Sequence, residues 1–109
     1  MEFTKLEKKI LRELFGQLYE QELIRETSML GKDFQDWKNG KISVWDINER
    51  IHNFHKGPSQ KLFVKYSTNH APTMALFVCG AIMNGEIKAE GLPIDLAAKI
   101  KSLESLFES

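Results

Sequence analysis

The stretch that decides the fold is residues 4–26, TKLEKKILRELFGQLYEQELIRE. Its apolar residues recur every three or four positions, the spacing of one face of an α-helix: Leu6, Ile10, Leu14 and Leu18. Thr4, with Glu7 three residues later, matches a capping box, in which each side chain accepts a hydrogen bond from the other residue's backbone N–H. The stretch therefore predicts a helix that begins near residue 4 and packs through one apolar face.

The helical pattern continues beyond this stretch to Asn39 and Gly40, a pair that commonly ends a helix. Ser28 and Gly31 weaken the middle of the segment, because neither residue type favours a helix interior. We therefore expect residues 4–39 to form two helices, or one bent helix.

Four further helices are expected downstream. Ser43 is a good N-cap, and Asp46 places a carboxylate in the first turn of its helix. Gly57 is suited to end that helix and Pro58 to begin the next. The four predicted helices cover residues 43–57, 58–66, 72–84 and 93–107. The chain is thus predicted to be all-α, a compact bundle of five to six helices with a central apolar helix near 72–84, in a single domain over residues 1–109.

The composition excludes several classes of function. Lysine plus arginine equals aspartate plus glutamate, at 15 each, so no overall field draws the chain toward nucleic acid or an acidic membrane. The single cysteine, Cys79, excludes an internal disulfide, and its apolar neighbours predict a buried thiol. The longest apolar run, Met74–Met83, is shorter than the roughly 20 residues that span a bilayer. Because the chain also begins without an apolar signal core, we expect a cytoplasmic protein that does not enter a membrane.

The region of residues 50–66, RIHNFHKGPSQKLFVKY, is the most suggestive for function. Four apolar residues form one stripe on its predicted helix and should be buried: Val44, Ile47, Ile51 and Phe54. His55 lies about 40° from the centre of this stripe and His52 about 100° from it. We therefore expect His55 to be half-buried and His52 to lie at the boundary, and we expect Leu62, Phe63 and Tyr66 of the following helix to point inward.

One interpretation of this region is a ligand site for an anion. The candidate residues are His52, His55, Lys56, Lys61, Tyr66 and Arg50. The helix expected to open near Pro58 would offer unpaired N–H groups to a phosphate or a carboxylate. Alternatively, the lysines form an ordinary solvated row. An acidic segment precedes them (Glu20, Glu22, Glu26, Asp33 and Asp36), and it could pair with the basic one inside the fold or with another copy.

Two other interpretations are weaker. His52 and His55 could bind a metal with His70, Asp36 or Glu49 as a third ligand, but no convergent set is visible, so we predict no metal and no cofactor. Arg50 and His55 are similar to the arginine–histidine motif of helical HEPN-type ribonucleases, and that resemblance implies a dimer cleft acting on the RNA backbone. On a regular helix the two side chains point about 140° apart, which opposes joint action.

Residues 37–66 also resemble a bacterial family of small helical proteins about 100 residues long. The family pattern is a Trp-x-x-Gly turn, then Ile-His-x-Phe-His-x-Gly, then a short helix ending in tyrosine. The matching residues are Trp37, Gly40, Ile51, His52, Phe54, His55, Gly57, Leu62 and Tyr66. Gln60 departs from it, because the pattern often has arginine there, and this weakens an anion-binding role. The resemblance implies a bacterial cytoplasmic helical protein and supplies no activity.

No complete catalytic constellation converges in the sequence: there is no activated serine or cysteine, no glycine-rich phosphate loop and no paired metal motif. We therefore predict a non-catalytic protein-interaction or regulatory module, with a protein partner or self-association. The alternative is a phosphate- or RNA-handling protein that uses His52 or His55 as a general base and binds a small anionic ligand or RNA.

Overall fold

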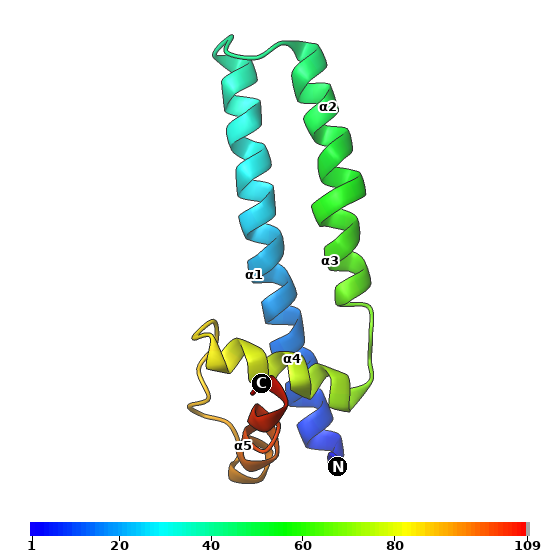
Figure 1. The fold of residues 1–109 in the computed structure, drawn as a ribbon, viewed down its shortest axis with the longest axis vertical. Coiled ribbons are helices and arrows are strands. Elements are labelled where there is room, and N and C mark those ends of the chain that lie inside the picture. The colour runs from blue at the N-terminus through cyan, green and yellow to red at the C-terminus, as the bar shows by residue number, and fades with distance from the viewer. Residues whose placement is uncertain (109) are drawn as a thin grey trace. The chain divides into compact units, whose positions relative to one another are not determined.

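The computed structural model describes residues 1–108, which are all-helical and contain no strand (Figure 1). The elements in chain order are α1 (Lys5–Lys38), α2 (Val44–Phe54), the π-helical segment η1 (His55–Ser59), α3 (Gln60–Lys65), α4 (Ala71–Met83), α5 (Ile94–Lys101) and the short 3₁₀ helix η2 (Glu104–Phe107). Because α2, η1 and α3 follow one another without a break, these residues contain four separate α-helices, and the prediction of five to six is not confirmed.

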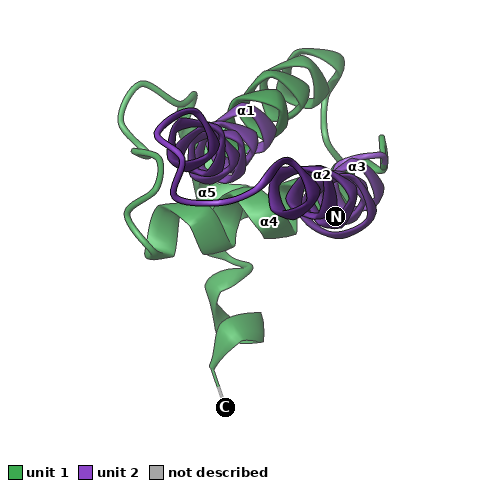
Figure 2. Cartoon of the chain, turned by 90° about the horizontal axis from the view of Figure 1, so that it is seen from above, with its two compact units in different colours: residues 1–18, 68–109 green, residues 19–67 purple. Residues whose placement is uncertain are grey.

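The chain divides into two compact units, coloured separately in Figure 2. Unit 1 comprises Met1–Leu18 and Thr68–Ser109, and unit 2 comprises Tyr19–Ser67. The first half of α1 belongs to unit 1 and its second half to unit 2. The expectation of one domain over the whole chain stays a prediction.

Helix α1 begins as the sequence predicts. The backbone N–H of Thr4 donates to Oε1 of Glu7 at 2.8 Å, and the N–H of Glu7 donates to Oγ1 of Thr4 at 3.1 Å. Of the two expected alternatives, two helices or one bent helix, the structure has a single helix, because α1 continues through Ser28 and Gly31 to Lys38. Each of these residues lowers helix propensity by less than about 1 kcal/mol relative to alanine, which does not break a helix of 34 residues. Beyond Lys38 the chain turns at Gly40, whose φ of 75° suits glycine.

Unit 1 has a closed apolar core around α4. The buried apolar residues of this unit are Phe3, Leu11, Phe15, Leu18, Ala71, Met74, Ala75, Val78, Cys79, Ala81, Leu96 and Ile100. The rings of Phe15 and Phe77 join α1 to α4, with centroids 5.8 Å apart. The predicted apolar helix near 72–84 is confirmed as α4, and Cys79 is a buried free thiol whose pKa is raised by burial. The predicted stripe of α1 is wrong at Leu6, which is 61% exposed.

A buried carboxylate replaces an apolar residue on the inner face of α1. Nζ of Lys99 lies 2.6 Å from Oε1 of Glu7, which also accepts the capping hydrogen bond from Thr4. The hydrogen bond from Lys99, followed by the one from the Thr4 backbone, lowers the pKa of Glu7 below its usual value. The pair joins α1 to α5 within unit 1.

The C-terminal helix is shorter than expected. Helix α5 ends at Lys101, and η2 follows, whereas the apolar pattern predicted one helix to residue 107. Ile94 is 86% exposed, because the buried face of this short helix runs through Leu96 and Ile100, one turn apart.

Unit 2 is a helical hairpin, formed by the second half of α1 and the continuous helix α2–η1–α3 (Figure 1). The predicted N-cap of α2 is confirmed: Ser43 and Asp46 form a capping box, with hydrogen bonds of 2.9 and 3.1 Å. The hydrogen bond from the Ser43 backbone lowers the pKa of Asp46. Within this hairpin, Ile47 and Leu62 are the only buried residues.

Candidate functional site

A cluster of side chains around Glu22 joins the two helices of the hairpin at the end opposite the turn at Gly40. The hydroxyl of Tyr66 donates to Oε2 of Glu22, and Nζ of Lys65 lies 2.9 Å from the same oxygen. The ring of Tyr66 stacks on that of Tyr19, with centroids 4.9 Å apart and planes at 6°. Tyr66, a predicted ligand residue, therefore holds the two helices of unit 2 together.

The environment of Glu22 contains two opposing effects on its pKa. Burial has the largest influence and raises the pKa, because it disfavours the charged carboxylate. The hydrogen bonds from Tyr66 and Lys65 act in the opposite direction and together outweigh burial, so the pKa lies below its usual value. Glu22 is therefore an anchored anion and is not poised to take up a proton near neutral pH.

Arg50 is also occupied within the hairpin. Its Nη1 lies 2.6 Å from Oδ1 of Asp33 on α1. Together with the Glu22–Lys65 pair, this contact realises the expectation that the acidic and basic segments pair inside the fold. Neither pair is fully buried, so each contributes little to stability and mainly fixes the register of the two helices.

The remaining four predicted ligand residues do not converge on these pairs. His52, His55, Lys56 and Lys61 are all exposed, so the expectation that His55 is half-buried is wrong. Among residues 1–108, neither the His52 ring nor the His55 ring has a hydrogen-bond partner that would fix its orientation. The structure thus brings Arg50 and Tyr66 to carboxylates of α1 and leaves the histidines in solvent.

The π-helical segment η1 explains why the predicted helix break at Gly57 and Pro58 is absent. Gly57 and Pro58 were expected to end one helix and begin another, but both lie inside η1. Proline lacks an N–H and its ring clashes with the carbonyl four residues earlier in an α-helix, and a local π-helical turn relieves this clash. The helix N-terminus predicted near Pro58, with its free N–H groups for an anion, therefore does not exist.

The same segment keeps the buried residues of the helix in line. Phe54 and Leu62 are eight residues apart, which in a regular α-helix would turn them about 80° away from each other. One α-helical turn and one wider π-helical turn together take about eight residues, so Leu62 returns to the line of Ile47 and Phe54. Tyr66, one further turn along, then faces Glu22.

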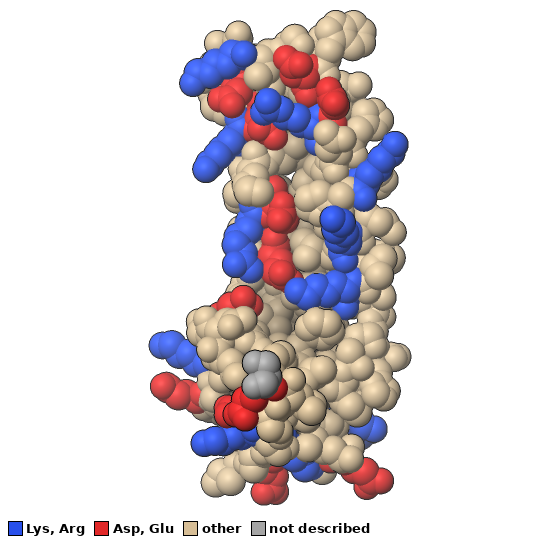
Figure 3. Space-filling model, in the orientation of Figure 1, with Lys and Arg blue, Asp and Glu red and all other residues tan. Residues whose placement is uncertain are grey.

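The hairpin has two different sides. On one side lie the ion pairs and an open hollow of about 220 Å³ lined by Glu26, Met29, Leu30, Asp33, Arg50, Asn53, Phe54 and Pro58. Figure 3 shows acidic side chains along the middle of the hairpin on this side, with basic side chains next to them. By helical geometry, Ile24 and Phe34 of α1 and Ile51 of α2 point to the other side.

Large apolar side chains of the hairpin remain in solvent. Six of them are more than half exposed: Ile24, Met29, Val44, Trp45, Phe63 and Val64. The predicted buried stripe is therefore wrong at Val44, and it is wrong at Ile51, which is 39% exposed. Phe63 was also expected to point inward. The physical reason is that each helix of a two-helix hairpin is covered by one neighbour, so only a narrow line of residues can be buried.

A signal for this exposure was available in the sequence and was missed. Leu23–Ile24, Val44–Trp45 and Phe63–Val64 are pairs of consecutive apolar residues. Neighbours on a helix point about 100° apart, so a narrow buried line can cover at most one member of each pair. Such pairs indicate an apolar surface beyond the one that the hairpin itself buries.

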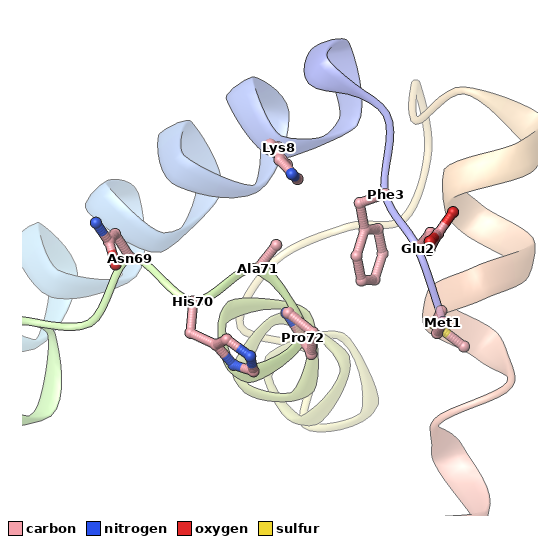
Figure 4. Close-up of a pocket in the computed structure, with 8 residues that line it drawn as sticks. All are labelled: Met1, Glu2, Phe3, Lys8, Asn69, His70, Ala71 and Pro72. Carbon is pink, nitrogen blue, oxygen red and sulfur yellow. The ribbon is translucent and has the colours of Figure 1, made fainter.

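A separate hollow lies in unit 1 (Figure 4). It has a volume of about 610 Å³ and is lined by Met1, Glu2, Phe3, Lys8, Asn69, His70, Ala71 and Pro72. His70 points its Nδ1 at Oγ1 of Thr73, 2.8 Å away, so its ring is held by its own helix. None of the six predicted ligand residues lines this hollow.

Within the part of the chain that the structure describes, no group of three or more histidine, cysteine, aspartate or glutamate side chains is placed to hold a metal ion. Over the same residues, no helix combines the length and the apolar character that crossing a bilayer requires. Comparison with known proteins finds no family model, no curated protein and no solved structure that matches this chain.

Proposed function

We propose that this protein is a non-catalytic protein-interaction module, and that its binding element is the hairpin of residues 19–67. One observation carries the proposal: six large apolar side chains of this hairpin are more than half exposed, while only Ile47 and Leu62 are buried. Together these aromatic and aliphatic side chains leave on the order of several hundred Å² of apolar surface, spread over both sides of the hairpin, that a partner could cover.

The energetics support a partner for this surface. Covering a half-exposed apolar side chain contributes about 1 kcal/mol, so a partner that covers several of them gains enough free energy for a specific complex. Trp45, at 79% exposure, is the side chain that a partner could bury most completely. Tryptophan at the centre of an interface is among the residues that dominate binding energy.

The electrostatics favour a role in binding over a role in catalysis. Arg50 and Tyr66, two of the residues expected at an anion site, are hydrogen-bonded to the carboxylates of Asp33 and Glu22. An anion at these groups would have to displace a carboxylate that is already in place. The alternative of a phosphate- or RNA-handling protein stays a prediction.

The proposal is tested by photo-crosslinking in the cell that makes the protein. A photoreactive phenylalanine analogue replaces Trp45 or Phe63 in the full chain. In the control, it replaces Lys32, an exposed polar residue of the same hairpin. We expect covalent protein adducts from positions 45 and 63 and far fewer from position 32. Equal yields at all three positions, or none at any of them, would contradict the proposal.

A further inference from the structure

The exposed side of α1 in the hairpin carries a regular stripe. Its members are spaced alternately four and three residues apart: Glu20, Ile24, Thr27, Gly31, Phe34 and Lys38. This spacing is that of the contact positions of a coiled coil, and it places the six residues along one line of the helix. All six are at least partly accessible, and Ile24 is 55% exposed. The stripe is distinct from the inner line of α1 that faces α2 and α3.

The stripe is complementary to itself when its direction is reversed. Its residues form three pairs, each placed symmetrically about position 29: Glu20 with Lys38, Ile24 with Phe34, and Thr27 with Gly31. In an antiparallel pair of identical helices, a two-fold axis at the level of position 29 would bring each residue opposite the other member of its pair. An acid then meets a base, an apolar residue meets an aromatic one, and a small residue meets glycine.

We propose that α1 packs antiparallel against α1 of a second copy of this chain through this stripe. The inference rests on the proposed function, and it names the partner as a second copy. Within residues 1–108, Glu20 and Lys38 take part in no ion pair, so both are free to pair across the two-fold axis. Two such pairs form per dimer, and the opposed helix dipoles add a favourable term.

The surface of α1 has room for the partner's aromatic ring. A hollow of about 300 Å³ is lined by Glu20, Leu23, Ile24, Thr27 and Ser28, all on this helix. In the antiparallel pairing, Phe34 of the second copy lies at the level of Ile24, which is within this hollow. Thr27 opposite Gly31 lets the two helix backbones approach closely at the centre of the contact.

The other helix of the hairpin supports the same axis. Ile51 and Phe63, which lie on the same side as the stripe, are each six residues from Gly57. The ion pairs Asp33–Arg50 and Glu22–Lys65 show that Gly57 is close to the level of position 29. One two-fold axis therefore pairs α1 with α1 and Ile51 with Phe63 of the second copy, which widens the contact toward the roughly 800 Å² per partner of a stable interface.

The test is sedimentation velocity of the full chain over a range of concentrations. We expect a reversible dimer that Glu20→Lys or Lys38→Glu weakens roughly tenfold, because each change sets like charges opposite each other twice. The double variant Glu20→Lys with Lys38→Glu should return the dissociation constant to within about threefold of the unmodified chain, since the pairs re-form with exchanged signs. Rescue by the exchange is specific to antiparallel self-pairing.

A matched pair of apolar substitutions tests the side of the helix. Ile24 and Met29 are both 55% exposed, but Met29 lies on the side of the ion pairs. Ile24→Asp should weaken the dimer roughly a hundredfold, whereas Met29→Glu should leave it unchanged. Circular dichroism confirms that each variant keeps its helix content, which is expected because both side chains are largely exposed.

Three results would overturn the pairing: a chain that stays monomeric at all concentrations, a double charge variant that is not rescued, or equal effects at Ile24 and Met29. A monomer whose positions 45 and 63 still crosslink to another protein would exclude the second copy and leave the proposed function intact. A monomer without such adducts would exclude both.

Discussion

The two units of this protein use the same kind of helix in different ways. In unit 1, Phe15 of α1 contacts Phe77 of α4, and Leu11 of α1 is fully buried in the core. In unit 2, the same helix continues, but Glu22 and Asp33 of its inner side form ion pairs with Lys65 and Arg50 of the opposite helix. The difference shows that a long helix can be stabilised by a core at one end while its other end remains available to a partner.

The largest effect expected from this contrast is in the core of unit 1. Leu11→Ala removes a fully buried side chain and should lower the free energy of unfolding by about 3 kcal/mol, measured by urea denaturation. Leu6→Ala on the same helix is the control, since Leu6 is exposed and its loss should change stability by less than about 0.5 kcal/mol. Equal effects would show that the core does not lie where the structure places it.

Hydrogen exchange compares the two units directly. Amides of α4 should exchange on the order of a hundredfold more slowly than those of α2, because α4 is buried and α2 has one buried residue, Ile47. The measurement is made at low protein concentration, where a dimer would dissociate. If protection in α2 equals that in α4 under these conditions, the hairpin is more stable alone than its packing predicts.

A smaller effect is expected at the start of α2. Ser43→Ala removes the N-cap hydrogen bond to Asp46 and should destabilise the hairpin by about 1 kcal/mol. Faster amide exchange in the first turn of α2 is the expected readout. Ser28→Ala, in the middle of α1 without a capping role, serves as the comparison and should not accelerate exchange there. If Ser43→Ala changes neither the stability of the hairpin nor the amide exchange in the first turn of α2, the cap is dispensable.

The smallest effect is on pH dependence. Glu7 in unit 1 and Glu22 in unit 2 both have a lowered pKa, so each stabilises the fold above the pKa of the unfolded chain. That contribution is lost as the pH falls through the lower folded-state pKa. Carboxyl titration by NMR should give both residues midpoints below an ordinary glutamate, and Lys99→Met should raise the midpoint of Glu7 alone. Unshifted midpoints would show that these contacts do not persist in solution.

Local signals in the sequence predicted most helix boundaries. The capping boxes at Thr4 and Ser43, the turn at Gly40 and the apolar helix α4 all follow from short-range chemistry. The π-helical turn around Pro58 could not be predicted in this way, because Gly57 and Pro58 favour a helix break in the sequence. The continuous helix becomes evident only in the structure, where Leu62 lies in line with Phe54.

The candidate site was less predictable than the fold. Helical geometry placed Val44 and Ile51 on a buried stripe, but burial depends on how many neighbours surround the helix, and a two-helix hairpin supplies one. The acidic and basic segments were identified correctly, although their particular pairs, such as Asp33 with Arg50, require the register of the hairpin. The role of Tyr66 as a donor to Glu22 depends on that same register.

The extra residue in η1 has an evolutionary consequence. A π-helical turn amounts to a one-residue insertion that the helix absorbs without shifting the residues after it. A homologue that lacks one residue between Phe54 and Leu62 would therefore keep the same hairpin, with an unbroken α-helix in place of η1. Such a sequence should also have lost the proline, because in an unbroken α-helix the ring of Pro58 would clash with the carbonyl four residues earlier and kink the helix. The joint gain or loss of one residue and one proline would thus trace the history of this helix among its relatives.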